Sequence, residues 1–194
     1  MLAEYPADFH IHTCLSPCAD DEMIPINILN MAKLMGIKIL GICDHNSAGN
    51  INAMLQMAQD YDVLVIPGME VQSVEEVHML CFFESLCKVL EWQEYVYRSL
   101  PPIKNNPRYF GHQWFVDDQG NILGEENRML LTSTLLTVEE ISQKVSELKG
   151  LLIPAHVDRM HYSIVGQLGF IPEKLKIDAV EFSKAITEEE FKKT

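Results

Sequence analysis

The chain has 194 residues, 47% of them hydrophobic, and this length predicts a single domain with one sizeable core. Its 15 Lys and Arg residues against 28 Asp and Glu give a formal net charge of −13, which argues against broad electrostatic capture of long nucleic acid or an anionic membrane. No stretch approaches the roughly 20 apolar residues that span a bilayer, and no secretory leader is evident, so we expect a cytoplasmic protein whose cysteines are free thiols.

Strand-like and helix-like segments alternate in the first half of the chain. The periodicity of apolar residues predicts strands over 7–13, 37–45, 62–71 and 75–83 and helices over 25–36, 50–61 and 85–97. The first helix is expected to begin at Pro25 and to end near Gly36, and the third strand to end at the Pro67-Gly68 turn. Alternating strands and helices at this spacing favour βαβ units and a parallel sheet.

The middle of the chain differs in character. Residues 101–128 are rich in turn formers and are interpreted as an insertion or lid, with a small hairpin around Gln119-Gly120. Regular alternation then resumes. Thr137 is the expected N-cap of a helix, with Glu140 at the capping-box distance. That helix covers 138–150, and strands over 151–156 and 178–183 complete one α/β domain that comprises residues 1–194.

Residue types that bind metals gather at the ends of the predicted strands. Because side chains alternate across a strand, Asp8, His10 and His12 face the same side. The carboxyl ends of parallel strands converge at one edge, which brings further candidates there: Asp44, His45, Glu70, His78, His156, Asp158 and Arg159. A lone histidine is more often a hydrogen-bonded core residue and a lone Asp a helix N-cap, but the combination favours a metal site.

Glu70 is the most informative of these candidates. A carboxylate, unlike an imidazole, can use two oxygens to bridge two cations and hold them about 3.5 to 4 Å apart. The sequence therefore predicts a site with more than one metal ion.

The strand-end motifs resemble those of a known family. The stretches "DFHIHTCLSPCADD", "GICDHNS", "IPGMEV", "VHML" and "IPAHVD" are similar to successive motifs of the polymerase and histidinol phosphatase family, or PHP domains, over residues 8–182. The resemblance implies a distorted (β/α)7 barrel, TIM-barrel-like, with up to three metal ions at its C-terminal face, and hydrolysis of phosphoesters.

The same resemblance implies a set of ligands. His10, His12 and Glu70 would bind one cation, and Glu70 would bridge to a second that His78 and His156 hold. Asp20 with His45 would serve a third, although Asp21 could replace Asp20 because the loop does not fix the register. Asp8 is interpreted as a partner that orients the histidines.

The chain departs from the family pattern near its C-terminal end. The family's late Asp-x-His motif should follow residues 178–183 but does not occur, so we expect this chain to lack the last elements of the barrel. His161 is a conceivable substitute ligand. Arg159 is a candidate for clamping a substrate phosphate, because a guanidinium binds phosphate bidentately.

We therefore expect a metal-dependent phosphoesterase that uses two or three ions of Zn, Mn or Fe and attacks a phosphomonoester, nucleotide or short oligonucleotide with activated water. His78 or His156, or a metal ion, would assist the leaving oxygen. The alternatives are a non-catalytic metal-binding or regulatory module and a metal-dependent amidohydrolase. Cys14 and Cys18 have a C-x-x-x-C spacing that could bind zinc, but no second thiol pair completes a structural site.

Overall fold

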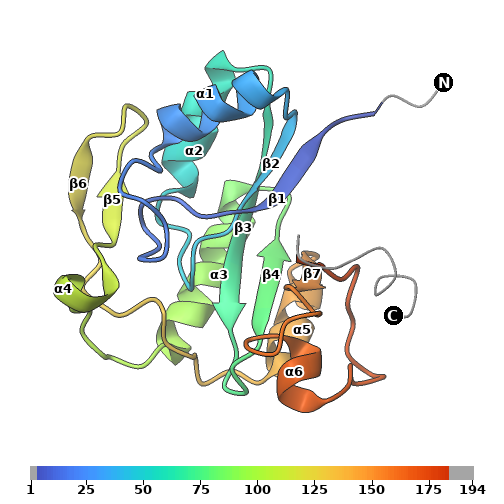
Figure 1. Cartoon of the computed structure of the whole chain (residues 1–194). Coiled ribbons are helices and arrows are strands. Elements are labelled where there is room, and N and C mark those ends of the chain that lie inside the picture. Colours follow the sequence, from blue (N-terminus) through green and yellow to red (C-terminus); the bar gives the residue numbers. More distant parts are fainter. Residues whose placement is uncertain (1–3, 184–194) are drawn as a thin grey trace.

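A curled five-stranded sheet forms the centre of the molecule in the computed structural model, which describes residues 4–183. Its order is β1-β2-β3-β4-β7, so β1 and β7 lie at the two edges (Figure 1). The strands are β1 (Ala7–Ile11), β2 (Ile39–Ile42), β3 (Leu64–Gln72), β4 (His78–Phe82) and β7 (Leu151–Pro154). This partial barrel agrees with the expected α/β class; the described residues hold five strands of the sheet rather than seven.

One strand of the sheet runs against the others. The β1–β2 and β2–β3 pairs are parallel, as expected, but β4 is antiparallel to both β3 and β7. The expectation of a wholly parallel sheet is therefore wrong for β4. The reversal has a useful result, because His78 is the first residue of β4 and so lies at the edge where β1, β2, β3 and β7 end.

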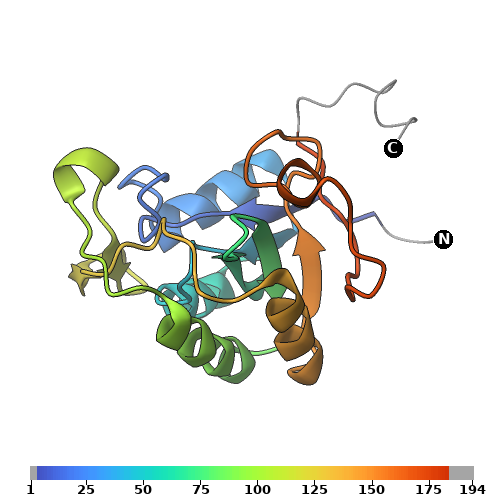
Figure 2. The same ribbon diagram turned by 90° about the horizontal axis from the view of Figure 1, so that it is seen from below.

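Four helices cover one face of the sheet (Figures 1 and 2). They are α1 (Pro25–Met35), α2 (Ile51–Met57), α3 (Leu86–Ser99) and α5 (Val138–Glu147), and α2 continues into the 3-10 turn η1 (Ala58–Asp60). The predicted limits of α1 are confirmed, since Pro25 is its first residue and Gly36 follows it with φ of 73°, a left-handed conformation that favours glycine.

Alternation along β3 separates the core from the site. Val65, Met69 and Val71 point toward the helices and belong to the main hydrophobic core. Gly68 and Glu70 point to the opposite face, where a smaller apolar cluster contains Leu80, Phe82, Cys43 and Ala155. The period of two thus places a carboxylate on the face that the helices leave uncovered.

The segment between α3 and α5 forms a small unit beside the sheet. It contains the short helix α4 (Pro107–Phe110) and the predicted hairpin, made of β5 (Trp114–Val116) and β6 (Ile122–Glu125), with Gly120 at φ of 83°. Asn50 links it to the core, because its side chain donates to the Trp114 carbonyl and accepts from the Val116 N–H. A lid function of this unit stays a prediction.

The predicted end of one strand and the predicted presence of another are wrong. β3 does not end at Pro67-Gly68 but continues to Gln72. The Pro67 carbonyl accepts from the Phe83 N–H just beyond the Gly68–Phe82 pair, so the proline lies at the end of the β3–β4 ladder, where its missing N–H does little harm. Residues 178–183 form no regular strand, although the N–H groups of Asp178 and Glu181 donate to carbonyls of β7. The region expected for the missing Asp-x-His motif lies outside the described residues.

The region between β7 and residue 178 contains one short helix, α6 (Ile164–Leu168), that the periodicity did not predict. Ser163 is its N-cap and Gly169 its left-handed C-cap. None of the helices within residues 4–183 has the length and apolar character needed to cross a membrane.

The N-cap of α5 offers a test of the local structure. The Thr137 hydroxyl accepts from the Glu140 N–H while the Glu140 carboxylate accepts from the Thr137 N–H, the predicted capping box. Thr137→Ala should lower the free energy of unfolding by about 1 kcal/mol, because it leaves a helix N–H unpaired. Thr137→Ser keeps the hydroxyl and is the matched control; equal urea midpoints for the two variants would contradict the assignment.

Candidate metal centre

The site is built around one buried carboxylate. Glu70 in β3 is only 1% exposed, and ring nitrogens of five histidines surround its two oxygens. These contacts are 2.9 Å from His78 Nδ1, 3.0 Å from His45 Nδ1, 3.3 Å from His10 Nε2, 3.4 Å from His12 Nε2 and 3.8 Å from His156 Nε2. The structure thus brings together six of the seven predicted metal ligands.

Strand ends position all five imidazoles. His10 belongs to β1 and His12 follows it, while His45 follows β2 and forms an isolated bridge with Glu70. His78 opens β4, and His156 follows β7. His156 has φ of 35°, a left-handed conformation that is strained for a non-glycine residue. The fold holds this strain while directing the ring toward Glu70.

The donor set fits divalent cations. Oε1 of Glu70 and Nδ1 of His156 are buried and have no hydrogen-bond partner among residues 4–183, although ring nitrogens lie close to Oε1. The ring nitrogens near Oε1 therefore approach it at angles that do not suit hydrogen bonds. This arrangement is expected when the nitrogens and the carboxylate are placed to bind the same ion. Imidazole nitrogens with a carboxylate are ligands that zinc, iron and manganese accept. His45, Glu70 and His78 offer donor atoms within 4.8 Å of one another.

Ser16 and Asp44 orient His12. The Ser16 hydroxyl donates to Asp44 Oδ1 at 2.7 Å, so its oxygen accepts from His12 Nδ1 at 3.0 Å and from the His45 N–H at 3.1 Å. This places the proton of His12 on Nδ1 and leaves Nε2 free to bind a metal. Asp44 also accepts from the hydroxyl and N–H of Thr13, both at 2.7 Å. Asp44 thus orders the loop after β1 rather than capping a helix.

Glu181 is a site residue that the motifs did not identify. Its carboxylate accepts from His10 Nδ1 at 2.9 Å and from the His156 N–H at 2.9 Å. His10 Nε2 is then the nitrogen that faces Glu70. Glu181 lies in the predicted strand 178–183, but no spacing rule distinguished it from a surface glutamate.

The carboxylates set the protonation of the cluster. Burial by itself would lower the pKa of His10, but the hydrogen bond to Glu181 and the nearby Glu70 carboxylate raise it to about 10. The pKa of His45 is likewise raised to about 10 by Glu70 and Cys18 despite burial. Burial lowers the pKa of His12 to about 3 and that of His156 to about 4. Without metal, two imidazoles are therefore protonated and two are neutral near pH 7.

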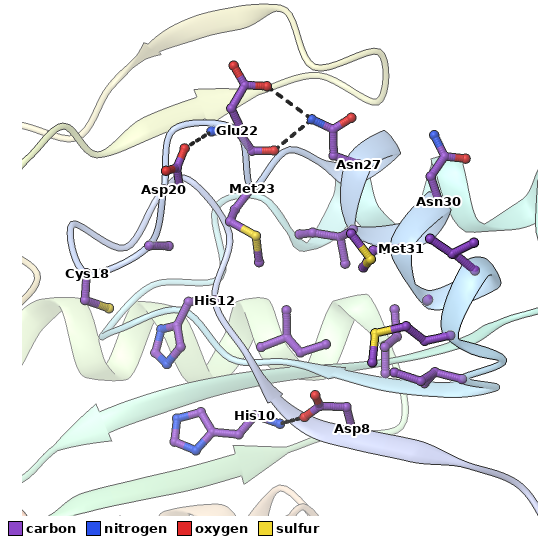
Figure 3. Close-up of a pocket in the computed structure, with 18 residues that line it drawn as sticks. Asp8, His10, His12, Cys18, Asp20, Glu22, Met23, Asn27, Asn30 and Met31 are labelled. Carbon is purple, nitrogen blue, oxygen red and sulfur yellow. Dashed lines mark hydrogen bonds between the residues drawn. The ribbon is translucent and has the colours of Figure 1, made fainter.

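The structure does not bring the loop aspartates into the cluster. Asp20 is exposed and its Oδ1 accepts from the Glu22 N–H at 2.9 Å, while Asp21 is also exposed. Cys18 of the same loop lies there instead, and its sulfur forms a potential three-donor group with His12 and His45. Figure 3 shows the Cys18 sulfur on the side of the His12 ring and the Asp20 carboxylate turned to Glu22.

Other predicted residues lie at the margin of the site. Asp8 accepts from the backbone N–H of His10 at 3.2 Å, so within the described residues it is Glu181 that orients the His10 ring. Arg159 is exposed on the loop after His156. The pKa of His156 is lowered mainly by burial, and the charges of His78 and Arg159 lower it further. His161 is exposed on the same loop.

A pocket of about 880 Å³ lies between β1 and α1 and reaches His10, His12 and Cys18 (Figure 3). Its walls are mostly apolar and include Met23 and Met31. Polar groups at its margin come from Asp8, Asp20, Glu22, Asn27 and Asn30. The metal centre therefore opens onto a cavity that could hold the non-reacting part of a small ligand.

Sequence comparisons match only part of the chain. No protein-family model matches the chain. An uncharacterized protein of Methanocaldococcus jannaschii is 32% identical over 97 residues, which cover 45% of this chain and 57% of that protein. This chain thus spans little more than half the length of that relative.

Solved structures resemble the chain more extensively. The lesion-specific endonuclease Q of Pyrococcus furiosus matches with a TM-score of 0.71 and 24% identity over 95% of this chain, but over only 43% of the endonuclease. A proposed metal-dependent phosphoesterase of Bifidobacterium adolescentis matches with a TM-score of 0.60 and 13% identity, covering 92% of this chain and 77% of that protein. At these identities the likeness shows a common fold, one found in metal-dependent hydrolases.

The contact between Glu181 and His10 predicts a loss of metal affinity. Glu181→Ala should weaken binding about 10- to 100-fold, because a partner that fixes the tautomer of a ligand histidine is removed. Glu147→Ala on the exposed side of α5 is the control and should bind as the parent protein does. Competition with a chromophoric chelator measures both; unchanged affinity in Glu181→Ala would show that this carboxylate has no part in the site.

The raised pKa of His10 and of His45, about 10 for each, predicts that metal binding releases protons. At about pH 8 both rings must lose a proton before they coordinate, so affinity should rise with pH between neutrality and about 10. Calorimetric titrations in two buffers with different ionisation enthalpies measure the release. Identical binding enthalpies in both buffers would exclude it.

Proposed function

We propose that the protein is a metal-dependent phosphoesterase that hydrolyses a phosphomonoester, nucleotide or short oligonucleotide by activated water. The observation that carries this proposal is the buried Glu70 carboxylate with five imidazoles around it. When bound, divalent cations would supply positive charge that polarises phosphoryl oxygens and lowers the pKa of water toward neutrality. His10, His12, His45, Glu70, His78 and His156 are the residues that would hold them.

The residues of the chain have distinct roles in this proposal. Glu70 lies between two groups of imidazoles, which suits a bridging carboxylate. His78 and His156 contact it through one ring nitrogen each, so the other nitrogen could hold a proton near the leaving oxygen. Arg159, exposed beside His156, would bind the phosphoryl group of the substrate.

Pocket shape and charge favour a small substrate. The cavity beside His10 and His12 is mostly apolar, with carboxylates at its margin, and suits a neutral sugar or nucleoside better than a long polyanion. The formal charge of −13 acts in the same direction. Endonuclease Q has also been solved with a 27-mer duplex substrate, so a nucleic-acid phosphodiester is included among the candidate substrates of this fold.

The alternatives are less well supported. An amidohydrolase would be favoured by a bridging lysine, but within residues 4–183 the basic side chains that contact Glu70 are all histidines. A non-catalytic metal-binding module would use the same ligands but would have no need of Arg159 or of the cavity beside His10 and His12. Activity measurements separate this reading from the enzyme.

Removal of one ligand should abolish hydrolysis. His12→Ala should reduce turnover of an aryl phosphate by more than about 100-fold, since changes outside the ligand set alone cost 10–100-fold. A chelator should have the same effect on the parent protein, reversed by Mn²⁺, Fe²⁺ or Zn²⁺. His161→Ala, at an exposed histidine outside the cluster, is the control.

The assay should cover nucleotides, sugar phosphates, dinucleotides and short DNA. Equal activity of His12→Ala and the parent protein would identify a contaminant as the source. Tight metal binding without hydrolysis of any of these compounds would support the non-catalytic module instead.

A further inference from the structure

We infer that Cys18 is a metal ligand and that Cys18, His12 and His45 form a cysteine-containing cation site at the rim of the Glu70 centre, which selects a thiophilic ion such as Zn²⁺. This inference rests on metal binding in the proposed function but not on phosphoester hydrolysis. It assigns to a thiolate the place that a loop carboxylate was expected to take.

Geometry provides the first support. The Cys18 sulfur and one nitrogen each of His12 and His45 lie within 4.8 Å of one another. Zinc bonds are about 2.3 Å to sulfur and 2.0 to 2.1 Å to nitrogen, so a small side-chain adjustment suffices to close the three donors on one ion. Cys18 is exposed, which leaves its side chain room for that adjustment.

The loop holds Cys18 in this place. Asp44, which is buried, fixes the beginning of the loop through Thr13 and Ser16. Farther along, the Ala19 N–H donates to the Ser16 carbonyl at 2.9 Å, which turns the chain back over the end of β1. The same Ser16 hydroxyl orients His12. One hydrogen-bonded unit therefore positions both the thiol and an imidazole.

Asp20, the loop carboxylate expected to bind the third cation, is engaged elsewhere. The Asp20 carboxylate accepts from the Glu22 N–H, and its carbonyl accepts from the Met23 N–H, so Asp20 stabilises the turn that leads into α1 (Figure 3). A thiolate at this position changes selectivity, because soft sulfur ligands favour zinc over manganese and magnesium.

The four remaining cysteines cannot take this role. Cys81 is buried in β4, and its S–H donates to the Met79 carbonyl. Cys43 lies near His10 and His12 but is fully buried, and its S–H donates to the carbonyls of Phe9 and Ile11. Burial keeps its pKa well above the usual range, so it remains a neutral thiol. Cys14 is also buried, beside the Trp114 carbonyl, which excludes a zinc pair with Cys18. Cys87, at the start of α3, is exposed like Cys18 and far from the cluster in the fold, and it offers a matched control.

Cobalt substitution tests the ligand directly. Co²⁺ added to the metal-free full chain should give a thiolate-to-cobalt charge-transfer band in the near ultraviolet. Cys18→Ser should lose this band, and its Zn²⁺ affinity should fall by at least about 10- to 100-fold. Cys87→Ser should keep both. Cys18→Asp should bind without the band and shift the preference from Zn²⁺ toward Mn²⁺.

Alkylation provides a second measurement that does not depend on activity. Zn²⁺ should protect Cys18 from iodoacetamide while Cys87 reacts as before, which mass spectrometry quantifies. A band that survives Cys18→Ser, or equal alkylation of both thiols with Zn²⁺ bound, would overturn the inference and leave the phosphoesterase proposal intact. A thiolate band in a protein without hydrolytic activity would support this site while overturning that proposal.

Discussion

A carboxylate enclosed by imidazoles is the interaction on which the rest of the structure depends. Glu70 is almost fully buried, and its charge is retained because the surrounding histidines hold its pKa well below the usual range despite burial. The five imidazoles come from the ends of four strands, β1, β2, β4 and β7, so the sheet must keep these ends together. Much of the loop structure around the sheet serves to orient these rings.

Residues behind the histidine cluster hold the rings in their orientations. Asp44 and Ser16 set the tautomer of His12, and Glu181 does the same for His10. These partners are polar, buried or half-buried, and linked to more than one element of the fold. They fix the orientation of the rings before any cation arrives, which lowers the reorganisation that binding requires.

Sequence reasoning could predict most of the residues that gather around Glu70, because strand periodicity and strand ends are local properties. His10 and His12 alternate in one strand, and the other histidines follow or open apolar runs that read clearly as strands. Glu181 could not be identified in this way, because its role depends on a long-range contact with His10. The direction of β4 could not be predicted either, because an apolar run does not indicate whether a strand pairs parallel or antiparallel. The prediction that Asp20 of the loop after β1 reaches the site failed for a different reason. Several residues of this loop could bind a metal, and the sequence does not show which of them faces the histidines.

The two edges of the open sheet meet at the site. His10 belongs to edge strand β1 and His156 follows edge strand β7, and Glu181 contacts both. A cation shared by these strand ends would act as a cross-link between the first and last strands of the sheet. Ligand binding would then stabilise the fold by mass action and fix the curvature of the sheet at the same time. The candidate metal site would then also stabilise the fold, and loss of the metal would make the whole sheet less stable.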